Sequence, residues 1–430
     1  MCNPPGHTIG NEPPSLLSLT GAGNKLWIKR ELGEGSLTKP GPKVSRMLLI
    51  VGLLVGIFLA VKFLYADNQA FIKGELSRGQ IVGRDFLNNW TAATLAGEGQ
   101  YHDIYDPALL RTHFPDKVNE SDVIFYFAYP PHVLTLLLPL RNFDYISALI
   151  LWSILCLVLF LLAATLGSGQ LNRLWLLSLA PTTFLNLTFG QNGLLTGALL
   201  IGGLRALEKH PRLAGILFGL LSIKPHLGLL IPFALIAGKH WQAFFWASLS
   251  TLGALGASVL ILGPEAWQSW FQNAPWTYSK EFLEYGTGLG IIMQVSPFIT
   301  TRLLVGDLGV AWTIQIICGL IALVSVVTVF LRSKDPLLKL AVLVTATYLV
   351  SPYVHNYDAA ALSAVVLLLV QRGLSQGFEK TEQTLLIITW LTPFFAMSFA
   401  ASGFPYAPFV WMTLLALLCY KSLRPIYIHG

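Results

Sequence analysis

The sequence predicts an all-α polytopic membrane protein, and two observations lead to that class. Hydrophobic residues make up 54% of the 430 residues and charged residues only 12%, a balance typical of chains whose main solvent is lipid. Apolar stretches of roughly 15 to 25 residues recur from Met47 to Tyr420, and helices of that length cross a hydrocarbon core of about 30 Å. A soluble globular protein is excluded by the same composition.

Three parts follow one another along the chain. Residues 1–46 are rich in Pro, Gly, Ser and charge and cannot bury enough apolar surface to fold alone, so a disordered cytoplasmic tail is expected. Residues 47–422 are expected to form one membrane domain, and residues 423–430 a cytoplasmic C-terminal tail. About ten crossings are predicted in the domain, over residues 47–65, 145–166, 172–188, 193–207, 241–262, 307–331, 336–351, 357–371, 382–399 and 407–421.

A further apolar segment, residues 213–238, is broken in its middle by Lys224 and Pro225. Each half is about a dozen residues long, which is short for a crossing. Proline also removes a helical hydrogen bond. We therefore expect a re-entrant helical hairpin that enters the membrane and returns to the side from which it came.

The distribution of Lys and Arg predicts the orientation, because short loops rich in these residues stay cytoplasmic. With both termini inside, the inner segments collect most of the basic residues, for example Arg205, Lys209 and Arg212. The long first loop, residues 66–144, then falls outside. The stretches that contain Asp85, the GQNG turn and the SPYVHNYD turn share this outer face, as a pocket at the membrane boundary requires.

The first outer loop contains GRDFLNNW, YHDIYDP and FYFAYPPHVLTLLLPL. Its length and mixed polarity predict short helices that lie on the membrane surface and roof a cavity. Asp85 is a candidate general base, since a carboxylate beside such a cavity could take a proton from a hydroxyl. The alternative is a solvated surface carboxylate or a helix cap. Asp103 and Asp106 lack the further ligands that a cation site needs, so no metal site is predicted.

Lys224 lies inside an apolar stretch, where a charged side chain costs roughly 2.5 to 3.5 kcal/mol. A phosphate group would compensate that charge. The motif IKPHLG adds His226 two residues later, with free amides at the start of the next half-helix. Alternatively, Lys224 extends to the interface or pairs with an internal carboxylate such as Asp358.

Gln191 and Asn192 lie in an FGQNG turn, between glycines that permit a tight turn and a close approach of the backbone to a ligand. Hydrogen bonds to sugar hydroxyls are one interpretation, and an ordinary turn is the other.

In SPYVHNYD, Pro352 ends one helix and leaves Tyr353, His355 and Asp358 near the start of the next. His355 could donate to a phosphate oxygen. Asp358 either caps the following helix, which we favour, or orients a neighbour.

These motifs together resemble glycosyltransferase family 87, the polyprenol-phosphate-mannose-dependent mannosyltransferases and relatives of the membrane-embedded GT-C class. The resemblance covers about residues 47–420. It rests on RDF, YHDIYDP, YPP, GQNG, AGILFGLLSIKPHLGLL and SPYVHNYD, in this order.

The resemblance implies a GT-C-like fold and an inverting transfer of mannose, or another pentose or hexose, from a polyprenyl phosphate to an extracytoplasmic glycan or glycolipid, without a cofactor. Asp85 matches the general base of the family, and Lys224, His226 and His355 are expected to bind the donor phosphate. Expected contacts of the sugar or the acceptor are Tyr129, Gln191, Asn192, Tyr353 and Asp358. The setting is the lipid bilayer of a bacterial plasma (inner) membrane, and no nucleic-acid partner is expected.

Two alternatives stay open. A transporter or flippase for lipid-linked sugars predicts inverted repeats with matching broken helices, and one broken hairpin is visible. A structural or assembly subunit predicts that the polar residues can be replaced without loss of function. The sequence contains no P-loop, zinc spacing, G-x-S-x-G or Rossmann fingerprint, which argues against nucleotide hydrolysis as a driving reaction.

Overall fold

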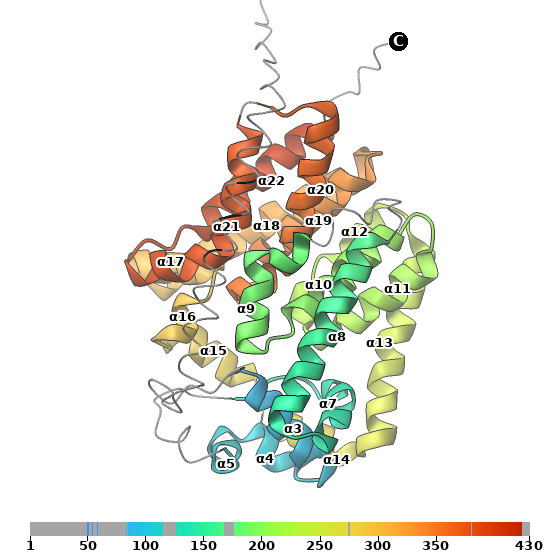
Figure 1. Ribbon diagram of the computed structural model, residues 1–430, viewed down its shortest axis with the longest axis vertical. Coiled ribbons are helices and arrows are strands. Elements are labelled where there is room, and N and C mark those ends of the chain that lie inside the picture. Colours follow the sequence, from blue (N-terminus) through green and yellow to red (C-terminus); the bar gives the residue numbers. More distant parts are fainter. Residues whose placement is uncertain are drawn as a thin grey trace, which may run out of the picture.

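The computed structural model in Figure 1 describes residues 50, 54, 58, 83, 85–114, 126–166, 176–273, 276–379 and 381–423. Across these residues the regular structure is helical, and one isolated β-bridge joins Gln294 and His355. The predicted all-α class is therefore confirmed for this part of the chain. The predicted tail 1–46, all but the first residue of the predicted tail 423–430, most of the first crossing 47–65 and parts 66–82, 84 and 115–125 of the first loop lie outside the described residues.

Five helical segments are long and apolar enough to cross a membrane, and each coincides with a predicted crossing. They are α8 (Tyr145–Thr165), α13 (Trp241–Leu262), α18 (Leu308–Arg332), α21 (Glu382–Ala401) and the segment Asn356–Gln376, which joins η5 (Asn356–Ala359) to α20 (Ala360–Gln376). Only 11% of the most apolar window of α13 is buried. A helix so apolar and so exposed belongs at a boundary with lipid.

Three more predicted crossings form shorter helices. α10 (Gly193–Ala206), α19 (Pro336–Val350) and α22 (Ala407–Leu423) have 14, 15 and 17 residues. At 1.5 Å per residue they extend about 21 to 26 Å, which is less than the hydrocarbon thickness. That they cross the membrane stays a prediction, as does the total of about ten crossings.

The predicted crossing over residues 172–188 is wrong as a single helix. Within its described part, a short 3₁₀ turn precedes α9 (Pro181–Phe189), which ends at Gly190 with φ 62°. Nine residues extend only about 14 Å. Proline favours the first helical position and a left-handed glycine ends a helix, so the sequence itself limits α9 to this length.

The segment predicted as a hairpin is helical on both sides of Lys224. α11 (Pro211–Leu220) continues into η3 (Leu221–Ile223), and η4 (Pro225–Gly228) leads into α12 (Ile231–Ala237). The backbone leaves the helical conformation at Lys224, with φ −131° and ψ 78°, because Pro225 follows it. The predicted break is confirmed, and the re-entrant path through a membrane stays a prediction.

The centre of the molecule is formed by α10, α19 and α20, which contact one another and are covered by α8, α11, α18, α21 and α22. Nearly every residue of α10 is buried. Its Gly197 allows a close approach, since a Cβ there would lie 3.2 Å from the Cβ of Ala360. A helix that is apolar on all sides is typical of such a buried position.

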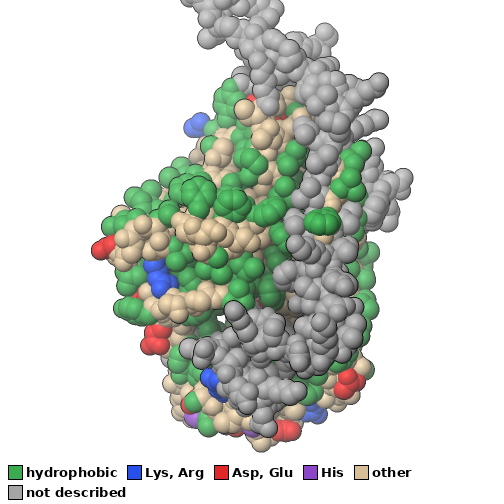
Figure 2. Space-filling view, turned by 60° about the vertical axis from the view of Figure 1, so that its left-hand side comes forward, with side chains coloured by type: hydrophobic (Ala, Val, Ile, Leu, Met, Phe, Trp, Pro, Cys, Tyr) green, Lys and Arg blue, Asp and Glu red, His purple; other side chains and the backbone are tan. Residues whose placement is uncertain are grey.

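Short helices gather at the lower end of the view in Figure 1. From the first loop come α3 (Phe86–Gly97), α4 (Tyr101–Tyr105), α5 (Pro107–Thr112), α7 (His132–Leu137) and η1 (Leu138–Asn142), and α14 (Pro264–Asn273) packs against α4. The predicted short helices of this loop are thus present. In Figure 2, hydrophobic side chains cover the middle of the visible face, and the charged ones lie toward the lower end and one edge.

The segment between α13 and α18, for which the sequence analysis predicts no crossing, folds into a run of helices. After α14 come α15 (Trp276–Tyr285), α16 (Leu289–Ile292) and α17 (Pro297–Val305). Arg302 joins them, since its guanidinium donates to the carbonyl oxygens of Leu283 and Gly286 at 2.8 and 2.6 Å.

Candidate active site

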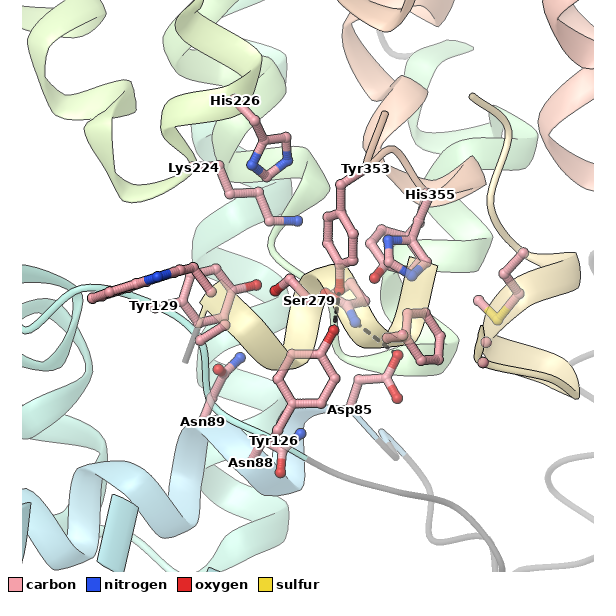
Figure 3. Close-up of a pocket in the computed structure, with 18 of the residues that line it drawn as sticks. Asp85, Asn88, Asn89, Tyr126, Tyr129, Lys224, His226, Ser279, Tyr353 and His355 are labelled. Carbon is pink, nitrogen blue, oxygen red and sulfur yellow. Dashed lines mark hydrogen bonds between the residues drawn. The ribbon is translucent and has the colours of Figure 1, made fainter. Parts of the chain in front are cut away.

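One cavity of about 990 Å³ lies between the short helices and the central bundle. Its lining includes seven of the nine residues predicted for the site, which are Asp85, Tyr129, Gln191, Lys224, His226, Tyr353 and His355. Figure 3 shows the basic side chains in the upper part of the cavity and Asp85 in the lower part. The predicted convergence of these distant motifs is therefore confirmed.

Asp85 stands directly before α3 and is held by the end of α9. Its backbone N–H donates to the carbonyl oxygen of Phe189 at 3.1 Å. The Gln191 side-chain amide donates to Asp85 Oδ2 at 2.7 Å. A hydrogen bond to a carboxylate is stronger than one between neutral groups, so Gln191 orients the carboxylate in the cavity.

The two glycines of the GQNG turn let it pack against protein on both sides. A Cβ at Gly190 would lie 2.5 Å from Cβ of Phe86 in α3, and one at Gly193 would lie 2.3 Å from the carbonyl oxygen of Tyr357 in η5. The glycines were expected to let the turn approach a ligand closely. In the structure they let it approach neighbouring parts of the protein, the Phe86 side chain and the Tyr357 backbone. Through this turn, the segments that carry Asp85 and His355 are kept at a defined separation.

Asn192 and Asp358 are not among the described residues that line the cavity. The Asn192 amide donates to the Tyr129 hydroxyl at 3.1 Å, and Asp358 is 1% exposed. Both residues lie behind the cavity wall. Their predicted contacts with the sugar or the acceptor stay predictions, and each residue contacts a lining residue, Tyr129 or Lys224.

Lys224 makes a buried ion pair with Asp358. Its Nζ donates to Asp358 Oδ1 at 2.7 Å, and the side chains are 5% and 1% exposed. The ammonium also lies 5.3 Å from the centre of the Tyr357 ring. The internal carboxylate considered above as the alternative partner is therefore present. The other Asp358 oxygen accepts from the backbone N–H of His355 at 3.1 Å, as the favoured capping role requires.

His355 is held by a second buried polar group, Gln294. Gln294 Nε2 lies 3.2 Å from His355 Nε2, and Gln294 Oε1 accepts from the backbone N–H of Val354 at 3.0 Å. The imidazole stacks on the Tyr357 ring with 4.8 Å between the ring centres. These contacts restrict the orientation of a ring that lines the cavity.

His226 stands edge-on to Tyr353, with 5.8 Å between the ring centres. Its Nε2 is buried and has no hydrogen-bond partner within the described residues. The Tyr353 hydroxyl lies 2.9 Å from that of Tyr126. Burial raises the pKa of both phenols, so each keeps its proton and can donate to a ligand or to the other.

Sequence reasoning missed several lining residues. Asn88 and Asn89 follow Asp85 at helical spacing, and their signal was the NNW of the first motif. The others come from the segment after α13. Its sequence EAWQSWFQNAPWTYSKEF lies between two predicted crossings, on the outer face. The many aromatic residues in this segment were the signal that could have indicated a site. Among them are Trp270, Trp276 and Ser279.

The structure gives other partners to the loop carboxylates that were considered for a cation. Asp103 Oδ2 lies 3.0 Å from His113 Nε2, and the Asp106 carboxylate accepts from two backbone N–H groups at the start of α5. Among the described residues, His, Cys, Asp and Glu form no group of three that could hold a metal ion.

The cavity thus places a carboxylate below three basic side chains, in a space at the upper end of the range for small-molecule sites. A carboxylate can accept a proton from a hydroxyl, and cationic or N–H groups can stabilise a phosphate that leaves.

Comparison with known proteins places the chain in a family. The model of glycosyltransferase family 87 matches residues 127–352, which is more than half of the chain. No curated protein and no solved structure matches the chain. The match includes the GQNG turn and Lys224, whereas His355 lies three residues after its end and Asp85 lies 42 residues before its start. It favours a glycosyltransferase over the transporter and assembly alternatives, and the chain belongs to glycosyltransferase family 87.

Proposed function

We propose that the protein is an inverting membrane glycosyltransferase that takes a sugar from a polyprenyl phosphate and transfers it to a hydroxyl of an extracytoplasmic glycan or glycolipid. The observation that carries this proposal is the single cavity in which Asp85 faces Lys224, His226 and His355. Each group then has one part in the reaction.

In the proposed step, the oxygen of the acceptor hydroxyl attacks C1 of the donor sugar and its proton passes to Asp85. The bond between C1 and the phosphate oxygen breaks, and its electron pair leaves with the phosphate. A base and a leaving group on opposite sides of the sugar favour direct displacement, which inverts C1. The order of the groups along the cavity in Figure 3 is consistent with this geometry.

The basic side chains suit a leaving phosphate in different ways. Lys224 is already neutralised by Asp358, so the pair as a unit brings little net charge to the donor. His226 Nε2 has no partner among the described residues, and His355 is held by Gln294. We assign the direct hydrogen bonds to phosphate to these two imidazoles, and only a short-range electrostatic contribution to Lys224.

The donor and the location are proposed on two supports. Apolar residues such as Phe282, Leu289 and Met293 share the cavity lining, and they could contact the first units of a polyprenyl chain. The placement of Lys and Arg puts the cavity on the extracytoplasmic face. We propose a multi-pass protein of a bacterial plasma (inner) membrane, with mannose as the first sugar to test.

The test is release of free polyprenyl phosphate from polyprenyl-phosphate mannose by the full chain in lipid nanodiscs, with a membrane extract as the source of acceptor. Loss of a general base lowers turnover by roughly 100- to 10,000-fold, so Asp85→Asn should reduce release to that extent. Asp103→Asn is the matched control, since Asp103 lies in the same loop and does not line the cavity.

Three results decide the proposal. Release by wild type and by Asp103→Asn, with the expected loss in Asp85→Asn, supports it. Equal release by all three would remove Asp85 from the reaction. No release from any lipid-linked sugar by folded wild-type protein would overturn the proposed donor.

A further inference from the structure

Asn88 and Asn89 form a pair of amides that the described part of the protein leaves without hydrogen bonds. Asn89 is 4% exposed, and Asn88 is partly buried. Within the described residues neither side chain makes a hydrogen bond, and Asn88 Oδ1 is fully buried without a partner. Buried polar groups are almost always hydrogen-bonded. Both residues line the cavity, so a ligand in it is the available partner for the polar atoms of the pair other than the buried Asn88 Oδ1.

The helix α3 presents these amides on the same face as Asp85. Residues three and four positions apart are neighbours on a helix surface, and Asp85, Asn88 and Asn89 have that spacing. Figure 3 shows all three in the lower part of the cavity, away from Lys224 and His226. Whatever binds the amides therefore lies next to the carboxylate.

The chemistry of the pair specifies a ligand with several hydroxyl groups. Each amide offers two N–H donors and one acceptor oxygen, which suits groups that both donate and accept and does not suit a phosphate alone. Trp270 and Trp276 line the same cavity, and their ring centres are 4.9 Å apart. An indole presents a flat apolar face against which the C–H face of a sugar ring can pack.

We propose that Asn88 and Asn89, with Trp270 and Trp276 in the same cavity, form the subsite for the sugar residue of the acceptor that carries the attacking hydroxyl. This inference rests on the proposed function, because it takes Asp85 as the base. The attacking hydroxyl must lie within hydrogen-bond reach of that base. Amides on the next turn of the same helix are placed to hold the neighbouring hydroxyls of the same ring.

The test measures binding without turnover. Methyl glycosides of mannose, glucose and galactose are titrated into the full chain in nanodiscs and followed by saturation-transfer NMR, with empty nanodiscs as the blank. A phosphonate analogue of the donor, in which carbon replaces the glycosidic oxygen, occupies the donor side throughout. The variants are Asn89→Ala, Asn88→Ala and Trp276→Leu, and each is checked for folding by its thermal unfolding.

Asn142→Ala is the matched control, since Asn142 is exposed in the first loop and does not line the cavity. We expect Asn89→Ala to weaken the preferred glycoside about tenfold, as the loss of one good hydrogen-bonding group does, with a smaller loss for the other two cavity variants. Asn142→Ala should bind as wild type does, and the KM for the lipid donor should not change in Asn89→Ala.

The contrary results are distinct. Unchanged glycoside affinity in Asn89→Ala, or no glycoside binding by wild type, overturns the subsite. A raised KM for the donor with unchanged glycoside affinity would show that the amides hold the donor sugar, which overturns the acceptor assignment and leaves the transferase intact. Glycoside binding that depends on Asn89, in a protein that releases no polyprenyl phosphate, would overturn the proposed function and the acceptor role with it.

Discussion

The upper and lower walls of the cavity differ in whether their polar side chains have hydrogen-bond or ion-pair partners within the described protein. The basic wall, defined as Lys224, His226 and His355, comes from two breaks in the buried bundle, and two of its three side chains have partners inside the protein, in Asp358 and Gln294. The amide wall, defined as Asp85, Asn88 and Asn89, comes from α3, and its two asparagines have none within the described residues.

The difference follows from the cost of leaving each kind of polar group without a partner in the substrate-free protein. A lysine buried among apolar helices needs a counter-ion at all times, because an uncompensated buried charge is costly. Lys224 in the basic wall is therefore compensated without substrate. Neutral amides at the cavity edge cost less to leave unpaired. The amide wall can thus keep its hydrogen-bonding capacity for a ligand.

The largest effect is expected where the basic wall loses its internal partner. Lys224→Met leaves Asp358 buried and unpaired, which should lower the free energy of unfolding by about 3 to 5 kcal/mol. Chemical unfolding in nanodiscs measures this loss. In the double variant Lys224→Met/Asp358→Asn most of the stability should return while turnover stays low.

Lys421→Met is the control for that change, because Lys421 makes a partly buried ion pair with Glu382 at 2.6 Å, away from the cavity. It should lower stability by a smaller amount and leave turnover unchanged. If the double variant of the basic wall regained full turnover, the pair would be purely structural and the comparison of the walls would fail.

The next largest effect concerns the turn that joins the walls. Gly193→Ala places a methyl group 2.3 Å from the carbonyl oxygen of Tyr357. The backbone must shift, at a cost of about 1 to 3 kcal/mol, and both turnover and the midpoint of thermal unfolding should fall. Gly253→Ala in α13 meets nothing within 4 Å and should be neutral or slightly stabilising. Equal behaviour of the two variants would contradict the role of the turn.

A smaller effect is expected at the support of the base. Gln191→Ala removes the hydrogen bond to Asp85 Oδ2, and turnover at saturating donor should fall about tenfold, or about 1.4 kcal/mol in activation free energy. Donor KM should stay near the wild-type value, because the amide does not belong to the basic wall. Gln100→Ala, at an exposed position of the same outer loop, is the control. A change confined to KM would assign Gln191 to donor binding instead.

The smallest effect is expected at the contact between Tyr126 and Tyr353. Tyr126→Phe leaves one hydroxyl without its partner and should lower stability by about 1 kcal/mol. The double variant with Tyr353→Phe should cost less than the sum of the single changes, since the two hydroxyls are 2.9 Å apart. Strict additivity in thermal unfolding would show that this contact does not couple the first loop to the late turn.

The sequence by itself determined the all-α membrane class, five of the long helices and the break at Lys224, because apolar length and proline are local properties of a chain. It also predicted that distant polar motifs meet, since charge placement sets the side of each loop. Pro181 and Gly190, which limit α9 to nine residues, are also present in the sequence. The apolar run that contains them nevertheless led to the prediction of a full crossing.

Only the tertiary structure decided which polar groups are used and which are free. That Asp358 neutralises Lys224 from 134 residues away, and that Asn88 and Asn89 have no such partner in the described part of the chain, depends on how helices distant in sequence pack. The segment that contributes Trp270 and Trp276 also lies at the site because elements distant in sequence pack together. Hydrogen bonding is decided by a few tenths of an ångström between side chains, and no local pattern of residues specifies that distance.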